Sequence, residues 1–383
     1  MLKRIYPLLS AAVLLSGVQP LYVLNADCAA EPEISAKAAV LISADTGEVI
    51  YSLNSGEKLP MASTTKIMTA LLCLESGDLS EEFTVDSEAI KVEGSSMGLQ
   101  EGDIVTKYAL SCGMLLPSGN DAANAAAVRI AGSIPAFVEL MNDRAQEIGL
   151  SHTYFVTPSG LDGEGHGSTA YDMALLAREA LRNEDFRSIC SQTSIKVSFG
   201  APPYDRWLKN TNKLLGRYEG TYGVKTGFTD EAGRCLVSAC ERDGKDLICV
   251  TLNDRSDWQD HAALYDYGFA VTELRRPELP GLEELDTVGG VKDGLKLKYG
   301  EIPELTTAGK ISEPEYTLLS APFVYAPVKE GDEAAQLRIS LNGREAVTVP
   351  VYAAEDIAAA PVSSPKKSGK LKKIISKLRE FIF

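Results

Sequence analysis

The sequence has few of the residues that most often bind metals. It contains three histidines, His152, His166 and His261, which lie far apart, and none forms a His-x-x-x-His pair. Such a pair places two imidazoles on one face of a helix, where both can bind zinc. The sequence therefore predicts no metal site and no zinc-dependent chemistry, and it indicates no other cofactor.

Cysteine is also used sparingly. Apart from Cys28, the chain has six cysteines, and their spacing is neither that of a disulfide framework nor that of a metal site. If residues 242–245 form a hairpin turn, Cys235 and Cys249 would face each other, so a disulfide between them is one hypothesis. The alternative is buried free cysteine, which is the commoner state of such residues.

Positive charge is scarce in most of the chain. The sequence has 53 Asp and Glu against 38 Lys and Arg, a net charge of -15. Residues 1–30 carry a small positive excess, and residues 366–383 hold seven Lys and Arg against Glu380. The part between them is therefore more acidic than the whole chain. Such a surface repels phosphate backbones, so a nucleic-acid partner is excluded.

The chain lacks an uninterrupted apolar run long enough to span a membrane. Pro7 and Pro20 interrupt the apolar stretch from Ile5 to Leu24. This stretch follows two basic residues and ends before small residues at 28–30, an order typical of a secretory signal peptide. We expect residues 1–30 to be a signal peptide, and a retained membrane anchor is the alternative.

The basic C-terminus has an amphipathic pattern. In residues 370–383 the apolar side chains fall on one helical face and the lysines fall elsewhere. A helix of this length reaches roughly 21 Å, too short to cross a bilayer. After a linker at residues 356–369, we expect this helix to lie on an anionic membrane surface. The alternative is a disordered basic tail held by an anionic polymer.

A Ser-Thr-Thr-Lys sequence at 63–66 begins a segment whose apolar residues recur at helical spacing. Positions i and i+3 of a helix share a face, so the Ser63 hydroxyl and the Lys66 amine can meet. A hydroxyl beside a neutral amine is a nucleophile with its own base. The same spacing recurs three times next to glycine or proline, which disfavour a helix. An ordinary amphipathic helix is the alternative.

Two further short motifs follow. Ser118-Gly119-Asn120 lies in a loop before an alanine-rich helix, and Lys225-Thr226-Gly227 lies at the start of a strand. Each alone could be a helix cap or a polar turn. Their order after the first motif, at intervals of about 55 and 107 residues, is far more specific.

This order resembles that of the penicillin-recognising serine enzymes. The sequence around the motifs is similar to that of the low-molecular-mass penicillin-binding D-alanyl-D-alanine carboxypeptidases. The similar segments are residues 62–66, 116–123, 160–170 and 223–233. The resemblance covers residues 38–269 closely and the rest more loosely. It implies a mixed α/β (α+β) fold of the β-lactamase/transpeptidase type, an antiparallel sheet flanked by helices, with a small all-β C-terminal domain.

The strand pattern agrees with this division. Apolar residues alternate with polar ones at 288–291, 295–299, 337–341 and 347–351, as in half-exposed sheets. We expect a peptidase domain at 31–274 and a β-rich domain at 275–355. Hairpin strands near residue 45 and strands at 235–252 should belong to one sheet of the peptidase domain.

The resemblance also implies roles for the first two motifs. Ser63 would attack the carbonyl between two D-alanines and form an acyl-enzyme, with Lys66 as the base. Ser118 would relay the proton to the departing D-alanine, and Asn120 would bind the substrate amide. Asp121 is expected to be a surface or capping acid of its helix.

By the same resemblance, Lys225 and Thr226 would bind the terminal carboxylate of the substrate. Gly227 would leave the strand edge open for the substrate, and the backbone N–H groups of Ser63 and Phe228 would form an oxyanion hole. Some family members add an arginine after the second strand. Arg255 lies in that region and is a candidate, although Lys225 and Thr226 could suffice.

The sequence thus predicts a serine-type DD-carboxypeptidase that removes the terminal D-alanine from peptidoglycan stem peptides ending in D-Ala-D-Ala and is acylated by β-lactams. Its expected place is outside the cell, at the outer face of the cytoplasmic membrane or in the cell wall. A class A β-lactamase is one alternative, but that class usually has aspartate where this chain has Gly119. A penicillin-binding sensor or scaffold without turnover is the other.

Overall fold

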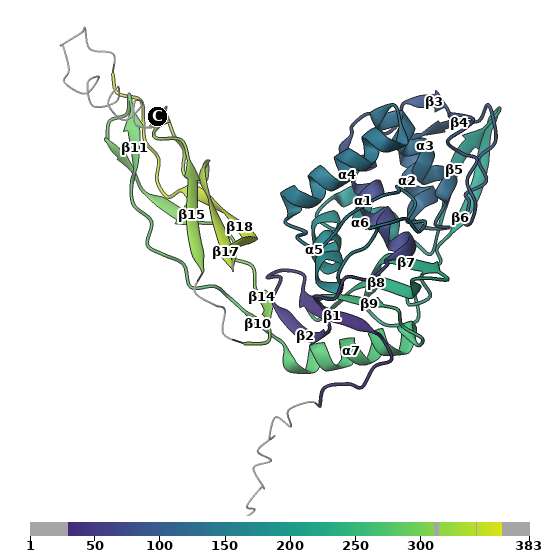
Figure 1. The fold of residues 1–383 in the computed structure, drawn as a ribbon. Coiled ribbons are helices and arrows are strands. Elements are labelled where there is room, and N and C mark those ends of the chain that lie inside the picture. Colours follow the sequence, from purple (N-terminus) through teal and green to yellow (C-terminus); the bar gives the residue numbers. More distant parts are fainter. Residues whose placement is uncertain (1–29, 310–313, 342, 362–383) are drawn as a thin grey trace, which may run out of the picture.

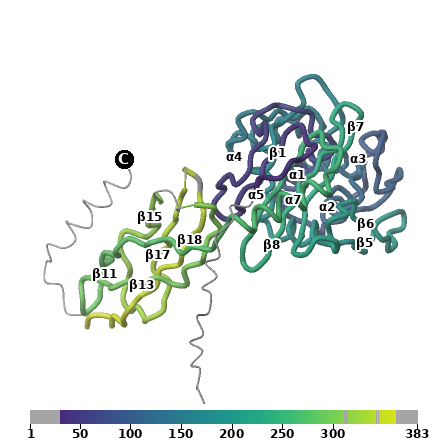
Figure 2. The backbone as a smooth tube through the Cα atoms, turned by 90° about the horizontal axis from the view of Figure 1, so that it is seen from below, coloured from purple at the N-terminus to yellow at the C-terminus, as the bar shows by residue number. Residues whose placement is uncertain are grey.

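The computed structural model describes residues 30–309, 314–341 and 343–361. The expected signal peptide, except its last residue, and the expected helix at 370–383 lie outside these residues. The chain forms two units that are joined at one side, an α/β unit (residues 30–272) and a β unit (residues 273–361) (Figures 1 and 2). No helix within the described ranges is long and apolar enough to cross a membrane.

A five-stranded antiparallel sheet forms the centre of the α/β unit. Its strand order is β2-β1-β9-β8-β7, so strands from both ends of the unit share one sheet, as the sequence predicts. The strands are β1 (Ala38–Ser43), β2 (Val49–Leu53), β7 (Thr221–Thr229), β8 (Gly233–Arg242) and β9 (Lys245–Leu252).

Both faces of this sheet are covered. Val40 and Ile42 of β1 pack into the larger apolar core, whereas Leu41 packs on the other face against Leu264 and Tyr265. This follows from the period of two in a strand. The second face is covered by α7 (Asp257–Val271), and Figure 1 shows the other helices on the opposite face.

The larger core lies between one face of this sheet and the helices that cover it. A second antiparallel sheet, of order β3-β4-β5-β6, lies at its edge. The elements are α1 (Lys66–Glu75), β3 (Glu82–Thr84), β4 (Ile104–Thr106), α2 (Lys107–Leu115), α3 (Asn120–Ala131), α4 (Ile134–Ile148), α5 (Ala170–Ala180), α6 (Glu184–Cys190), β5 (Ser194–Gly200) and β6 (Pro203–Lys209).

The β unit consists of two longer strands, β17 and β18, and several short ones around two small apolar clusters. Its main sheet has the order β13-β18-β17-β15, and β10 pairs with β14 beside the α/β unit. The strands are β10 (Glu273–Arg275), β11 (Leu285–Val288), β12 (Gly294–Leu295), β13 (Leu297–Tyr299), β14 (Leu305–Thr307), β15 (Glu315–Ser320), β16 (Val324–Tyr325), β17 (Glu333–Leu341) and β18 (Arg344–Ala353).

One expected strand is wrong in detail, and of the two states left open for Cys235 and Cys249 the structure has the free, buried one. The strand expected at 288–291 ends at Val288, because Gly289 enters a left-handed turn at φ +74°. The hypothetical disulfide is absent, since Cys235 and Cys249 are both free and buried. The β8–β9 register pairs Ser238 with Cys249, and the two cysteines belong to cores on opposite faces of the sheet.

Candidate active site

Ser63 lies in a 3₁₀ turn (Ala62–Thr65) that leads into α1, not in the α-helix that the sequence predicts. A 3₁₀ helix has three residues per turn, so side chains at i and i+3 eclipse each other. The Lys66 Nζ lies 2.9 Å from the Ser63 Oγ. Ala62 enters the turn at φ +48°, and a Cβ on Gly160 would lie 2.1 Å from the Ala62 carbonyl oxygen. Gly160, which has no side chain, can therefore pack directly against this strained turn.

Lys66 is fully buried and has two further partners. Its Nζ lies 2.6 Å from the Asn120 Oδ1 and 2.5 Å from the Ser159 carbonyl oxygen. The Asn120 amide is oriented by its Nδ2, which donates to the Glu93 carbonyl oxygen at 2.6 Å. A neutral amine has two N–H donors and one lone pair. Both donors can therefore go to these oxygens, which leaves the lone pair for the Ser63 proton.

The surroundings favour this neutral form. Burial lowers the pKa of Lys66 well below the ordinary value of 10.5, and the positive charge of Lys225 lowers it further. The negative charge of Asp121 opposes this effect in part. Burial also lowers the pKa of Lys225 to about 7. Burial thus favours the neutral amine that a general base at Lys66 requires.

The second motif forms the turn that leads into α3. Ser118 is almost buried, has φ +67°, and lines the same cavity as Ser63. Asn120 is the first residue of α3, and its backbone N–H donates to the Ser95 carbonyl oxygen at 2.7 Å.

Asp121 is buried, so of the two expected roles, a surface acid or a capping acid, the surface one is wrong. Its carboxylate accepts hydrogen bonds from the Ser96 hydroxyl and from the backbone N–H groups of Met97, Gly98 and Leu99, at 2.6 to 3.1 Å. Asp121 therefore holds the loop at 95–99 against the start of α3. No spacing in the sequence indicated this role, because the loop's donors are mostly backbone groups.

The third motif lies on β7. Lys225 is buried and donates to the Thr226 carbonyl oxygen at 2.8 Å. The Thr226 hydroxyl lies 2.7 Å from that of Thr211, which the sequence did not single out. A Cβ on Gly227 would lie 3.1 Å from the Ser63 nitrogen and 3.0 Å from the Met61 carbonyl oxygen. Glycine thus lets β7 run directly against the turn that carries Ser63.

A cavity of about 500 Å³ connects these motifs. Phe228 lines it with an exposed side chain. Several of the residues that line it were not predicted from the sequence. Its lining residues are Ser63, Ser95, Ser118, Thr211, Lys213, Thr226, Gly227, Phe228, Arg234, Asp257 and Trp258.

An arginine is present in the cavity wall, but it is Arg234 and not Arg255. Arg234 lies on β8 opposite Phe228 in the β7–β8 register. It forms an ion pair with the buried Asp257 at 2.5 Å, and its guanidinium lies 5.5 Å from the ring centre of Trp258. Arg255 is exposed and is not among the lining residues. The register of the short hairpin after Phe228 is the signal that could have identified Arg234.

His166 has a structural role beside the turn that carries Ser63. The His166 Nδ1 accepts from the Val156 backbone N–H, and its Nε2 lies 2.9 Å from the Thr65 hydroxyl. Burial lowers the pKa of His166 to about 4, so the ring is neutral at physiological pH and supports the turn that carries Ser63. Throughout the described ranges, no three His, Cys, Asp or Glu side chains gather in a way that could hold a metal ion.

Comparisons with known proteins agree with this geometry. The sequence profile of the D-alanyl-D-alanine carboxypeptidase family matches residues 25–256. The carboxypeptidase DacF of Bacillus subtilis is 34% identical over 381 residues, covering 94% of this chain and 96% of that protein. DacC of Escherichia coli is 30% identical over 354 residues and 85% of each chain.

Solved structures show the same fold. Penicillin-binding protein 5 of Haemophilus influenzae superposes with a TM-score of 0.63 at 27% identity, covering 86% of this chain and 99% of that one. The predicted mixed α/β fold of the transpeptidase type, with its antiparallel sheet flanked by helices, is thereby confirmed. The chain belongs to the D-alanyl-D-alanine carboxypeptidase family and is a serine-type carboxypeptidase.

Proposed function

We propose that Ser63 is the nucleophile that cleaves the terminal D-Ala-D-Ala bond of peptidoglycan stem peptides. The observation that carries this proposal is the set of three contacts around the buried Lys66 amine. Lys66 takes the proton of Ser63 as the Oγ attacks the carbonyl carbon. General base help of this kind typically accelerates a reaction about 10²- to 10⁴-fold.

The negative charge that develops on the carbonyl oxygen is met by the backbone N–H groups of Ser63 and Phe228. Each such donor typically lowers the barrier by about 3 kcal/mol. The C–N bond then breaks, and the departing D-alanine nitrogen receives the proton from Lys66 through the Ser118 hydroxyl. Water hydrolyses the acyl-Ser63 ester and regenerates the enzyme.

The substrate carboxylate binds to Thr226 at the wall of the cavity and to Lys225, which is buried next to it in β7, while Asn120 bonds the substrate amide. Gly227 keeps the edge of β7 open, so that the peptide can lie beside the strand. We assign the additional cation to Arg234, whose place in the cavity wall supports it better than the exposed position of Arg255. β-Lactams, which carry a carboxylate beside a reactive amide, acylate Ser63 in the same way.

The proposal also covers the division of the chain into domains and the place where the protein acts. We propose that residues 31–274 are the peptidase domain, 275–355 the β-rich domain and 356–369 a linker, and that the protein acts outside the cell after loss of residues 1–30. Residues 370–383 bind the membrane surface. Deletion of 366–383 should release the protein from membranes, and unchanged sedimentation with membranes would contradict this.

One assay tests the central proposal. Release of D-alanine from a peptide ending in D-Ala-D-Ala is measured for wild type and Ser63→Ala, in parallel with the lifetime of a labelled penicillin adduct. We expect turnover and labelling in wild type and neither in the variant. Labelling that survives Ser63→Ala would overturn the assignment. Fast adduct loss without D-alanine release would favour the β-lactamase, and a stable adduct without peptide turnover would favour the sensor.

A further inference from the structure

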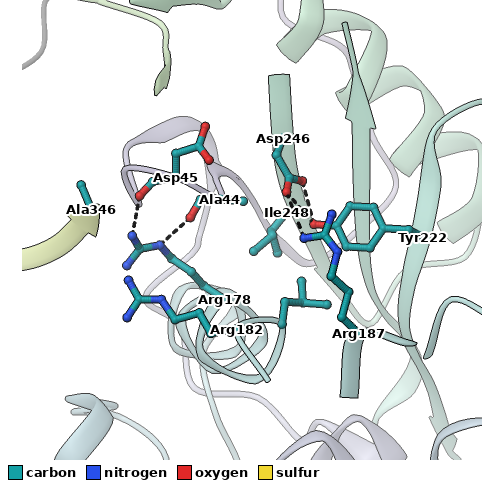
Figure 3. A pocket seen from close by; sticks show the side chains of 10 residues that line it. Ala44, Asp45, Arg178, Arg182, Arg187, Tyr222, Asp246, Ile248 and Ala346 are labelled. Atoms are coloured by element: carbon teal, nitrogen blue, oxygen red, sulfur yellow. Dashed lines mark hydrogen bonds and ion pairs between the residues drawn. The ribbon is translucent and has the colours of Figure 1, made fainter. Parts of the chain in front are cut away.

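The β unit packs against the α/β unit at one end only. At this near end, Arg178 and Arg182 of the α/β unit donate to the backbone carbonyl oxygen of Glu345, at 2.8 and 2.9 Å. Figure 3 shows this contact, in which Ala346 of β18 and Arg178 line one cavity. β11 lies at the opposite end of the β unit, the far end, in both views of the chain (Figures 1 and 2). A partner can therefore approach the far end without displacing the α/β unit.

An uncharged stretch of chain reaches this far end. β17 and β18 meet at Leu341 and Arg344 at the near end, and Ser320 of β15 pairs with Ala335 towards the other end of β17. The chain thus enters the far end after Ser320. Residues 316–328, which include this passage, contain no Asp, Glu, Lys or Arg, although 24% of the residues in the whole chain are charged. The far end therefore departs from the charged surface of the rest of the molecule.

The aromatic side chains of this stretch face outward. Val324 and Ala326 pack on the small apolar core around Leu295, as alternate residues of a strand do. Tyr325, which lies between them, is 70% exposed. Its ring stands edge-on to that of Phe323, with the ring centres 5.2 Å apart. Exposed apolar surface of this kind is a feature of protein and membrane contact sites.

The last described residues of the chain lie beside these rings. Tyr325 pairs with Val288 in the register of β16 and β11. Directly after β11, Gly290 forms a bridge with Ala359, close to the end of the described chain at residue 361. The neighbouring Val291 is 60% exposed. The chain therefore leaves the β unit next to its exposed apolar side chains.

Charged side chains flank this surface. Asp286, two residues before Val288 on β11, is exposed, and Lys292, next to Val291, forms an ion pair with Glu355. A contact through the aromatic rings is consequently driven by apolar burial, and it does not depend on a net charge of the far end.

We propose that the far end of the β unit, through Phe323, Tyr325 and Val291, contacts the headgroup region of a membrane. Tyrosine favours this region, because its ring is buried there while its hydroxyl stays hydrated. The position of the C-terminus selects a membrane as the partner. Residues 362–369 span at most roughly 28 Å, so the basic amphipathic segment at 370–383 begins close to this surface. The inference rests on the proposed membrane binding of that segment and is independent of the catalytic assignment.

The test uses vesicles of phosphatidylcholine and phosphatidylglycerol with brominated acyl chains, which quench tryptophan that enters the membrane. The whole chain has two tryptophans, Trp207 and Trp258, and both belong to the α/β unit. Tyr325→Trp should add fluorescence that these vesicles quench, whereas wild type should show little quenching. The matched control is Tyr204→Trp, which changes an exposed tyrosine of β6 and should behave as wild type does.

Affinity for unlabelled vesicles of the same composition is the second readout. Tyr325→Ser should weaken binding about three- to tenfold, because the apolar ring no longer leaves water. Tyr204→Ser should bind as wild type does. D-alanine release should be unchanged in both variants, which shows that they are folded.

The outcomes separate this contact from the amphipathic segment. Sedimentation with vesicles without quenching of Tyr325→Trp would overturn the contact at the far end and leave residues 370–383 as the only anchor. Absence of sedimentation in wild type would overturn both proposals. A dimer in solution that Tyr325→Ser dissociates, together with absence of quenching, would make a second copy of the chain the partner and contradict the membrane contact.

Discussion

The two units of the molecule treat polar groups differently. The α/β unit buries Lys66, Lys225 and Asp121, which do not line the catalytic cavity but lie close in sequence to Ser63, Thr226 and Ser118, which do. The β unit, over its described residues, buries threonines but no charged side chain, and its ion pairs, such as Lys298–Glu330, are exposed. Burying a charge is costly unless partners compensate. The α/β unit bears this cost in two places, at Lys66 and Lys225 in the site and at residues such as Lys107 and Asp172 outside the cavity, whereas the described part of the β unit avoids it.

The contact between the units is itself polar and relies on backbone groups. The Asp45 carboxylate accepts from the Thr306 N–H, and the Asp246 N–H donates to the Thr306 hydroxyl. Such a contact can hold the β unit in place without altering the cavity at Ser63. Changes in the two units should therefore have separable effects, and the predictions below order them by size.

The largest effect is expected from Lys66→Met, which keeps the volume but removes the base. Acylation by labelled penicillin should fall about 10²- to 10⁴-fold, as measured by stopped-flow or quenched labelling. The folded state should be retained, because an apolar chain replaces a buried amine. Lys107→Met is the matched control. Lys107 is also buried, but its Nζ bonds the Gly77 carbonyl oxygen away from the cavity, so acylation should be unchanged. Equal rates for Lys66→Met and wild type would remove the base from the mechanism.

A smaller effect is expected from Asp121→Asn. One carboxylate oxygen becomes an amide donor that faces the donors of the loop at 95–99, so the loop and Asn120 lose their fixed position. Acylation should slow about tenfold, and unfolding should become easier by about 1–3 kcal/mol. Asp172→Asn should cost similar stability without slowing acylation, since Asp172 is equally buried but bonds His152 and Thr153 outside the cavity. Parallel losses of rate in both variants would speak against a specific role of Asp121.

Arg234→Gln should change binding more than chemistry. We expect the KM for the D-Ala-D-Ala peptide to rise about tenfold, the effect of one lost charge-assisted bond, with kcat nearly unchanged. Arg255→Gln should leave both constants as in wild type. The reverse result, a raised KM only in Arg255→Gln, would move the carboxylate contact to Arg255.

The smallest effect is expected in the contact to the β unit. Thr306→Val removes the acceptor of the Asp246 N–H and should cost about 1 kcal/mol, seen as a melting temperature lower by about 2 °C. D-alanine release should be unaffected. A marked loss of activity would show that the two units are coupled, and the separation drawn above would fail.

The sequence predicted the parts of this structure that local patterns encode. Three features could be identified because their short motifs follow one another along the chain in a specific order. They are the Ser63 and Lys66 pair, the loop before Asn120 and the strand at Lys225. The fold class followed from the resemblance. The sheet shared by both ends of the α/β unit followed from its short apolar strands.

Other features depend on contacts between distant residues. The 3₁₀ turn at Ser63 is packed against Gly160, and an α-helical pattern does not reveal that. The Ser159 carbonyl beside Lys66 is a backbone atom, so no residue type indicates it. The register of a hairpin decides two features. It places Arg234 opposite Phe228, and it keeps Cys235 and Cys249 apart. Registers are set by turns and by packing across the sheet.

The central claim is that burial and Lys225 keep Lys66 neutral at working pH, so that it can accept the Ser63 proton. The most direct measurement is the acylation rate of the wild-type protein by labelled penicillin from pH 5 to 10.5. Because the pKa of Lys66 is lowered, the rate should stop rising well below pH 10.5, and it should then fall as Lys225, whose pKa burial lowers to about 7, loses the charge that binds the penicillin carboxylate. A rate that keeps rising to pH 10.5, as for a lysine of ordinary pKa, would contradict the account.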